Sequence, residues 1–205
     1  MALNSKKLQK KKAKRAAKNK DRKALLKKKN TGVRISSDNM LMKQASRYPI
    51  YQCWRAKYLF EGDSGVGTVI ITRKSQNGDV VMAVFLLDVF CLGVKNAFIS
   101  VLFEKDYLSQ LDEVMVNEEL EEISASSARK LIEEAENYAS ELGLFPHKDY
   151  HSAKKIFGNI DTKTCSESFE FGKEGKPYYI AGPYDSPSFS QKVIKQLMEK
   201  SDPDK

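Results

Sequence analysis

The sequence predicts an α+β domain, in which helices cover a mainly antiparallel sheet of about four or five strands, preceded by a basic N-terminal arm. Two observations predict the domain: strand patterns dominate residues 50–103, and helix patterns dominate the residues that follow. A third observation, the separation of positive charge into the first 30 residues, predicts the arm.

The arm is defined by its charge. Residues 1–30 contain 14 Lys or Arg and one acid, Asp21, for a net charge of +13. The rest of the chain contains 21 Lys or Arg and 26 acids, for a net charge of −5. With 205 residues, 41% of them apolar, the chain can form a sizeable core. We therefore predict a Lys-rich arm over residues 1–34 and a single α+β domain over residues 35–205.

The arm consists mainly of good helix formers, but its Lys side chains repel one another and its few apolar residues form no strong stripe. We expect it to be disordered alone and helical when a partner neutralises its charge. Asn30 and Gly32 then provide turn chemistry. The domain begins with a predicted short helix, Asp38–Arg47, which Pro49 stops.

Strand signals follow in close succession. Ile50–Phe60 alternates in polarity, and Thr68–Lys74 is rich in β-branched residues. The Asn-Gly pair at 77–78 predicts a hairpin turn. Val80–Phe90 is nearly all apolar, which is typical of a central strand covered on both faces. Ala97–Phe103 is predicted as another strand or as the start of a helix.

Helix signals dominate the second half. The predicted helices are Asp106–Val116, Ser126–Leu142, Asp149–Phe157 and Ser188–Lys200. In the second of these, apolar residues recur at helical spacing and Gly143 occupies the position after its C-terminus.

Between the last two helices, Ser168–Phe171 and Tyr178–Ala181 suggest a hairpin across residues 172–175. The loop-rich segment 172–187 could line a groove for a partner or serve only as a hairpin and connector.

Composition excludes several classes of protein. The longest apolar run, Val80–Phe90, is interrupted by Asp88 and is shorter than the roughly 20 residues of a membrane-spanning helix. Cys53, Cys91 and Cys165 are odd in number and widely spaced, which argues against a disulfide framework and a four-cysteine zinc site. Reduced thiols fit an intracellular protein. We expect it in the cytoplasm, or in the nucleus or nucleolus if the cell is eukaryotic.

The strongest functional signal is the arm, because a dense positive field displaces counterions from a phosphate backbone. Lys predominates over Arg, which favours point-charge contacts with phosphates over base readout. Other readings of the arm are binding to an acidic membrane or protein surface, and a solubilising tail. The nucleic-acid-binding candidates are Lys6, Lys7, Lys10, Lys11, Lys12, Lys14, Arg15, Lys18, Lys20, Arg22, Lys23, Lys27, Lys28 and Lys29.

The sequence thus favours a non-enzymatic RNA-associated protein, such as a ribosome or RNP accessory factor. RNA or another nucleic acid would bind residues 1–30, and the domain would supply placement or a protein contact. No aromatic RNP motif occurs, so aromatic strand residues are expected in the core rather than on a stacking surface. No cofactor is expected.

Asp88 is the unusual residue of the apolar run, because a buried carboxylate must be paired, hydrogen-bonded or protonated. We expect Asp88 to organise the turn at 91–93, either by capping it or by forming an ion pair. The alternative role is that of a metal ligand or general base at a strand end.

Both histidines lie close together, at His147 and His151, with Asp149 between them. Pro146 places His147 before or at a helix start, which weakens a rigid metal-binding pair. The residues still leave open an alternative function: a small metal-dependent hydrolase or nuclease that uses Asp88 with His147, Asp149 or His151.

A further alternative is a protein-binding adaptor that presents acidic helices to a basic partner. The acidic stretches that suggest it are Glu118–Glu122 and Glu133–Glu136. Solvated helix faces account for the same stretches without any partner.

Overall fold

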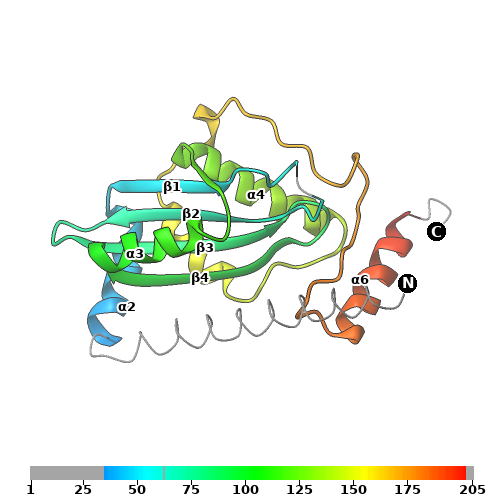
Figure 1. The fold of residues 1–205 in the computed structure, drawn as a ribbon, viewed down its shortest axis with the longest axis horizontal. Coiled ribbons are helices and arrows are strands. Elements are labelled where there is room, and N and C mark those ends of the chain that lie inside the picture. The colour runs from blue at the N-terminus through cyan, green and yellow to red at the C-terminus, as the bar shows by residue number, and fades with distance from the viewer. Residues whose placement is uncertain (1–34, 62, 202–205) are drawn as a thin grey trace. The chain divides into compact units, whose positions relative to one another are not determined.

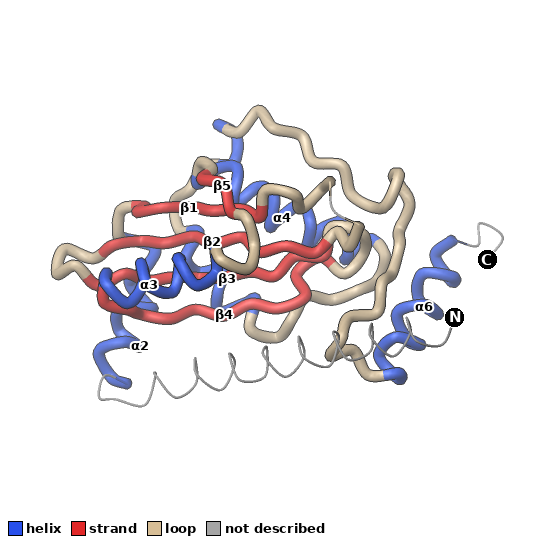
Figure 2. The backbone as a smooth tube through the Cα atoms, viewed as in Figure 1, coloured by secondary structure: helices blue, strands red, loops and turns tan. Residues whose placement is uncertain are grey.

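One antiparallel sheet organises the fold. The computed structural model describes residues 35–61 and 63–201. In these residues five strands lie in the spatial order β4-β3-β2-β1-β5 (Figure 1, with β5 labelled in Figure 2). They are β1 (Ile50–Ala56), β2 (Val66–Lys74), β3 (Asp79–Asp88), β4 (Gly93–Phe103) and β5 (Leu120–Glu122). Every neighbouring pair is antiparallel, which confirms the predicted α+β class.

The main helices lie close to their predicted positions. They are α2 (Ile35–Gln44), α3 (Glu104–Met115), α4 (Ala125–Glu141), α5 (Tyr150–Ala153) and α6 (Pro187–Ser201). The described part of the chain also contains three short 3₁₀ helices: η1 (Ala45–Arg47), η2 (Lys154–Phe157) and η3 (Thr162–Thr164). The helix predicted over residues 149–157 is therefore divided into α5 and η2.

The chain divides into two compact units. The larger unit comprises residues 36–181 and 185–205, and it contains the whole sheet. The smaller comprises residues 1–35 and 182–184, of which only residue 35 and residues 182–184 are described. The predicted basic arm, residues 1–34, lies entirely outside the described residues.

Both faces of the sheet carry a hydrophobic core. The larger core packs residues of α4, α5 and η2 against the sheet, including Leu131, Ile132, Ala153 and Ile156. The smaller core packs Tyr107 and Leu111 of α3 against the opposite face. Figure 2 shows these helices on either side of the strands. This two-sided cover explains why β3 reads as an almost continuous apolar run.

The predicted hairpin at 77–78 is confirmed, because β2 and β3 pair along their whole length across this turn. Gly78 has a φ of 86°, a conformation that suits glycine. β3 pairs with β2 on one side and β4 on the other, so it is an inner strand as predicted.

The α4 helix also follows its sequence signals. Ser124 accepts a hydrogen bond from the Ser127 N–H at 3.0 Å, which caps the helix N-terminus. Gly143, just beyond the C-terminus, has a φ of 75°, as the predicted terminator requires.

The hairpin predicted from Ser168–Phe171 and Tyr178–Ala181 is wrong. In this region only an isolated bridge joins Lys173 and Lys176. The flanking backbone instead bonds to the two residues that follow β3: Gly172 N–H donates to Val89 O at 2.8 Å, and Tyr178 N–H donates to Phe90 O at 3.1 Å. The carbonyl groups of Val89 and Phe90 thus accept the backbone hydrogen bonds that the predicted hairpin would have formed between its own two strands.

The helix proposed around residues 118–122 is also wrong, because Leu120–Glu122 forms strand β5 against β1. The physical reason is a cross-strand pair: the Arg55 guanidinium lies 2.6 Å from the Glu121 carboxylate. The acidic residues Glu133 and Glu134 do lie on a helix, α4, where they pair with Arg129 and Lys130.

Candidate functional site

The turn that joins β3 to β4 is built around Asp88. Its Oδ1 accepts backbone N–H groups from Phe90 at 3.1 Å, Cys91 at 3.0 Å and Leu92 at 3.4 Å. The predicted role of Asp88 as a turn cap is therefore confirmed. Burial raises the pKa of its carboxyl above the usual value, although the three N–H groups and Lys95 act in the opposite direction.

Part of the C-terminal segment is anchored to this turn. Lys95 Nζ lies 2.9 Å from Asp185 Oδ2, and Tyr179 OH donates to the same oxygen at 3.0 Å. Ser190 of α6 is 2.9 Å from the Tyr179 hydroxyl. Beneath them, apolar side chains form a third cluster: Cys91, Leu92, Leu142, Leu144, Tyr179, Val193 and Leu197.

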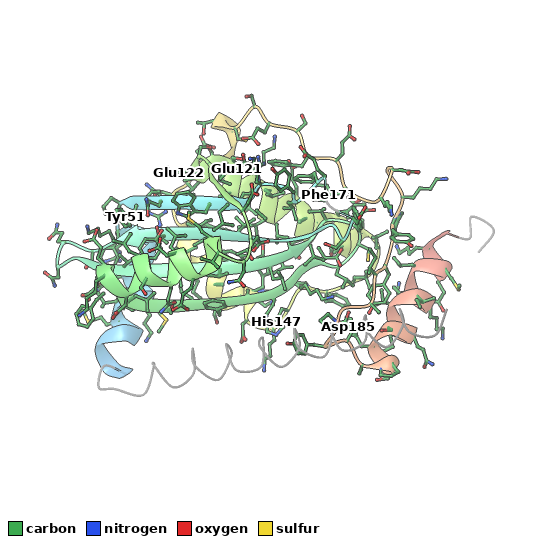
Figure 3. The ribbon with its side chains drawn as sticks, viewed as in Figure 1. Tyr51, Glu121, Glu122, His147, Phe171 and Asp185 are labelled. Atoms are coloured by element: carbon green, nitrogen blue, oxygen red, sulfur yellow. The ribbon has the colours of Figure 1, made fainter. Side chains whose placement is uncertain are left out.

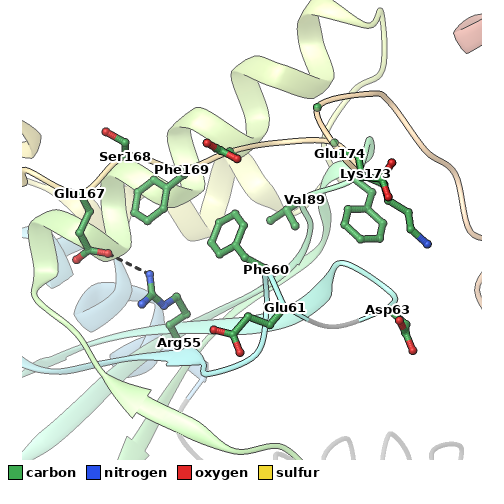
Figure 4. A pocket seen from close by; sticks show the side chains of 14 residues that line it. Arg55, Phe60, Glu61, Asp63, Val89, Glu167, Ser168, Phe169, Lys173 and Glu174 are labelled. Atoms are coloured by element: carbon green, nitrogen blue, oxygen red, sulfur yellow. Dashed lines mark hydrogen bonds and ion pairs between the residues drawn. The ribbon is translucent and has the colours of Figure 1, made fainter.

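A cleft of about 650 Å³ lies beside this turn (Figure 4). Val89 and Phe90 form part of its lining, together with the loop after β1 and residues 167–175. Phe60 stacks on Phe169 with ring centroids 5.7 Å apart, so the cleft has an aromatic wall. Sequence composition pointed to part of this region through the loop-rich segment 172–187.

Acidic side chains dominate the rim of the cleft. Two cations also line it: Lys173, and Arg55, which is already paired with Glu121 and, at 3.1 Å, with Glu167. Four further carboxylates form no ion pair within the described part of the chain, and all four are exposed: Glu61, Asp63, Glu170 and Glu174. Such a rim attracts cationic groups and repels phosphate, so the cleft is poorly suited to a nucleic-acid backbone.

The histidines lie beside β4 rather than in the cleft. His147 N–H donates to Val94 O at 2.9 Å. Its Nδ1 accepts the Asp149 N–H at 3.3 Å, so its nearest partner comes from its own turn. His151 is exposed, at the start of α5. Figure 3 shows His147 near β4 and Glu121 at the opposite side of the sheet.

Metal chemistry finds no support in the described residues. Within residues 35–61 and 63–201, no three His, Cys, Asp or Glu side chains gather closely enough to hold a metal ion. Asp88 is 1% exposed and its Oδ1 accepts the N–H groups of the turn.

The three cysteines are free, and burial raises the pKa of the Cys53 thiol to about 11.

Comparisons with protein-family models, curated proteins and solved structures found no match for this chain. In the described residues, no helix has both the length and the apolar character to cross a membrane. The fourteen Lys and Arg candidates of residues 6–29 lie outside the described residues.

Proposed function

We propose that this protein is a non-enzymatic RNA-associated protein, a ribosome or RNP accessory factor, that its basic arm holds on RNA. The observation that carries the proposal is the segregation of charge: +13 in residues 1–30 against −5 in the remainder. Counterion release from a phosphate backbone gives such a segment salt-dependent affinity without sequence readout. The acidic rim of the cleft supports assigning the RNA contact to the arm rather than to the domain.

Substituting lysines in the full-length protein tests the arm. The variant K10Q/K11Q/K12Q/K14Q removes four arm charges, and K105Q/K148Q/K192Q/K200Q removes four exposed charges of the domain. Binding to a single-stranded RNA is measured from 50 to 200 mM salt. Each phosphate contact contributes about 0.7 to the slope of log K against log salt, so the arm variant should lose up to about 3 from that slope.

The domain variant is the matched control, because its net charge changes by the same amount. Its slope of log K against log salt should differ from that of the wild type by no more than one phosphate contact contributes, about 0.7. Equal losses in the two variants would show that net charge alone governs binding, and an unchanged slope in the arm variant would rule out the arm as the binding segment. A duplex DNA probe in the same titration compares the two nucleic acids.

A second candidate function is a protein-binding adaptor, which the carboxylates around the aromatic wall of the cleft favour, because they form no ion pair within the described residues. Its partner would present Lys or Arg side chains. Binding of a Lys-rich peptide to the full chain, compared with the variant E61Q/E170Q/E174Q, tests it. Equal affinity of the peptide for both proteins would remove this candidate.

A further inference from the structure

The two edges of the sheet differ in character. β5, at one edge, has three residues, and two of them are Glu. β4, at the other edge, has 11 residues, and its stretch from Asn96 to Leu102 contains neither a charge nor a proline. Sheet edges are usually protected by short length, charge or proline, because unpaired backbone groups attract another strand. β5 has this protection and the central part of β4 lacks it.

Along the outer side of β4, the described chain forms a backbone hydrogen bond to another segment only near the N-terminal end of the strand. His147 N–H donates to Val94 O at 2.9 Å, which closes the N-terminal end of the edge. From Asn96 to Leu102, no other strand of the described residues pairs on that side. The register shift opposite Leu86 and Leu87 also lies before this stretch, so the pairing of β4 with β3 is regular over it.

The side chains of this stretch are suited to a continued sheet. Ile99 and Val101 pack against the larger core, and Leu102 packs against the smaller one. Phe98 is 42% exposed although it lies in the middle of a strand. The Ser100 hydroxyl is buried and has no hydrogen-bond partner in the described structure, which is costly for a polar group.

We propose that β4 pairs antiparallel with β4 of a second copy of this chain, about a two-fold axis that passes beside Ser100. Residues directly opposite one another in such a pair project from the same face of the sheet. This register places Ser100 opposite Ser100 of the partner subunit, where the two hydroxyls can hydrogen-bond. It also places Phe98 opposite Leu102 of the partner subunit, which covers the exposed ring.

The occupant is a second copy because β4 is complementary to itself. Antiparallel self-pairing brings no like charges together over Asn96–Leu102, since the stretch has none. It extends the all-antiparallel order of the sheet, and a two-fold interface closes on itself instead of propagating into a fibre. The shifted register centred on Ile99 would set Phe98 opposite Ser100 and leave the hydroxyl facing a ring. This dimer does not depend on RNA binding.

Disulfide trapping tests the register in the full-length protein. In a C165S background, which removes the more accessible native thiol, S100C and F98C are each treated with diamide, which takes up the two electrons and two protons that the thiols release. Directly opposite cysteines satisfy the Cα–Cα limit of about 6.8 Å. The two copies of residue 98 would be offset by four residues, about 14 Å. We expect crosslinked dimer from S100C and none from F98C.

Native mass provides an independent measurement that requires no cysteine. Light scattering of the wild-type protein should give twice the chain mass of 23.2 kDa. F98K places a charge on the proposed interface and should give the monomer mass. L108K, at an equally exposed position on α3, is the control and should remain dimeric, since both side chains are 42% exposed.

Three results would overturn the proposal. One is a wild-type protein that stays monomeric at tens of micromolar. Another is a dimer that S100C does not crosslink, because its interface then lies elsewhere. The third is F98C crosslinking as fast as S100C, which would show random collision or a different register. RNA binding with any of these results would leave the proposed function intact.

Discussion

Lys95 and Asp185, which are 90 positions apart, form an ion pair of 2.9 Å. Their side chains are only 18% and 10% exposed, and Tyr179 OH donates to the same carboxylate oxygen. Lys95 occupies the register shift at the start of β4, where the pairing with β3 skips one residue. The irregularity of the strand therefore directs a charged side chain toward the segment before α6.

Removing the lysine of this pair should destabilise the protein. K95M removes the Lys95 ammonium from the largely buried Asp185 carboxylate, and we expect a loss of about 2 kcal/mol in the free energy of unfolding. K195M is the matched control, because Lys195 and Glu199 form a pair whose side chains are 78% and 51% exposed. That variant should change stability by less than about 0.5 kcal/mol. Urea unfolding measures both, and equal effects would contradict the assigned role of Lys95.

The Asp88 cap depends on an acceptor oxygen more than on a charge. D88A leaves three backbone N–H groups without their acceptor and should cost about 2–4 kcal/mol of unfolding free energy. D88N keeps a side-chain oxygen and removes the cost of burying a charge, so it should retain most of the stability. A D88N loss as large as that of D88A, measured by urea unfolding, would show that the charge itself is required.

The raised pKa of Asp88 also predicts a pH dependence. The folded state holds the proton more tightly than the unfolded state, so stability is greatest below the unfolded pKa of about 3.9 and falls as pH rises through the folded pKa. D88N lacks this ionisation. The difference in unfolding free energy between wild type and D88N should therefore move in favour of D88N as pH increases over that window, and remain constant above it.

Local signals were sufficient to predict most of the fold. The Asn-Gly turn, the almost continuous apolar run of β3 and the helical spacing of α4 each agree with the structure, because tertiary packing reinforces local preference at these sites. β5 was missed because three residues are too few to show a period, and because its pairing depends on Arg55, far away in sequence.

The candidate site was less predictable, because its parts meet only in three dimensions. Asp88 could be identified from a carboxylate in an apolar run, and its capping role from the glycine turn that follows. The cleft could not be identified, since Phe60 and Phe169 are 109 positions apart and no local pattern links them. The hairpin expected around residues 168–181 failed because carbonyls of Val89 and Phe90 compete for the same backbone donors.

Alanine substitution at two glycines, Gly93 and Gly78, can separate the effect of backbone conformation on stability from the effect of packing. Gly93 and Gly78 both have positive φ, 61° and 86°. A Cβ on Gly93 would lie 2.6 Å from the Ala135 carbonyl oxygen of α4, whereas a Cβ on Gly78 meets nothing within 4 Å. G78A should cost about 1–2 kcal/mol of unfolding free energy from conformation alone. G93A should cost clearly more, and equal losses in thermal or urea unfolding would argue against close packing of this turn on α4.

Arg73 is a buried cation that is held by carbonyl groups rather than by a carboxylate. It is 2% exposed, and its guanidinium donates to Ile156 O at 2.6 Å, to Phe157 O at 2.7 Å and to Tyr48 O. These contacts join β2 to the end of η2 and to the segment before β1. Burial lowers the pKa of the guanidinium, but an arginine remains charged.

Substitution of Arg73 should therefore be among the most damaging changes in the sheet. R73M leaves three carbonyl groups without their donor and should lower the free energy of unfolding by about 3 kcal/mol. R73K keeps the charge, but a single ammonium cannot match the planar fork, so it should recover only part of that loss. The neighbouring K74M, which breaks a half-exposed pair with Glu104, should cost less than about 1 kcal/mol. Full recovery by R73K in urea unfolding would show that charge, rather than the fork geometry, secures η2 to the sheet.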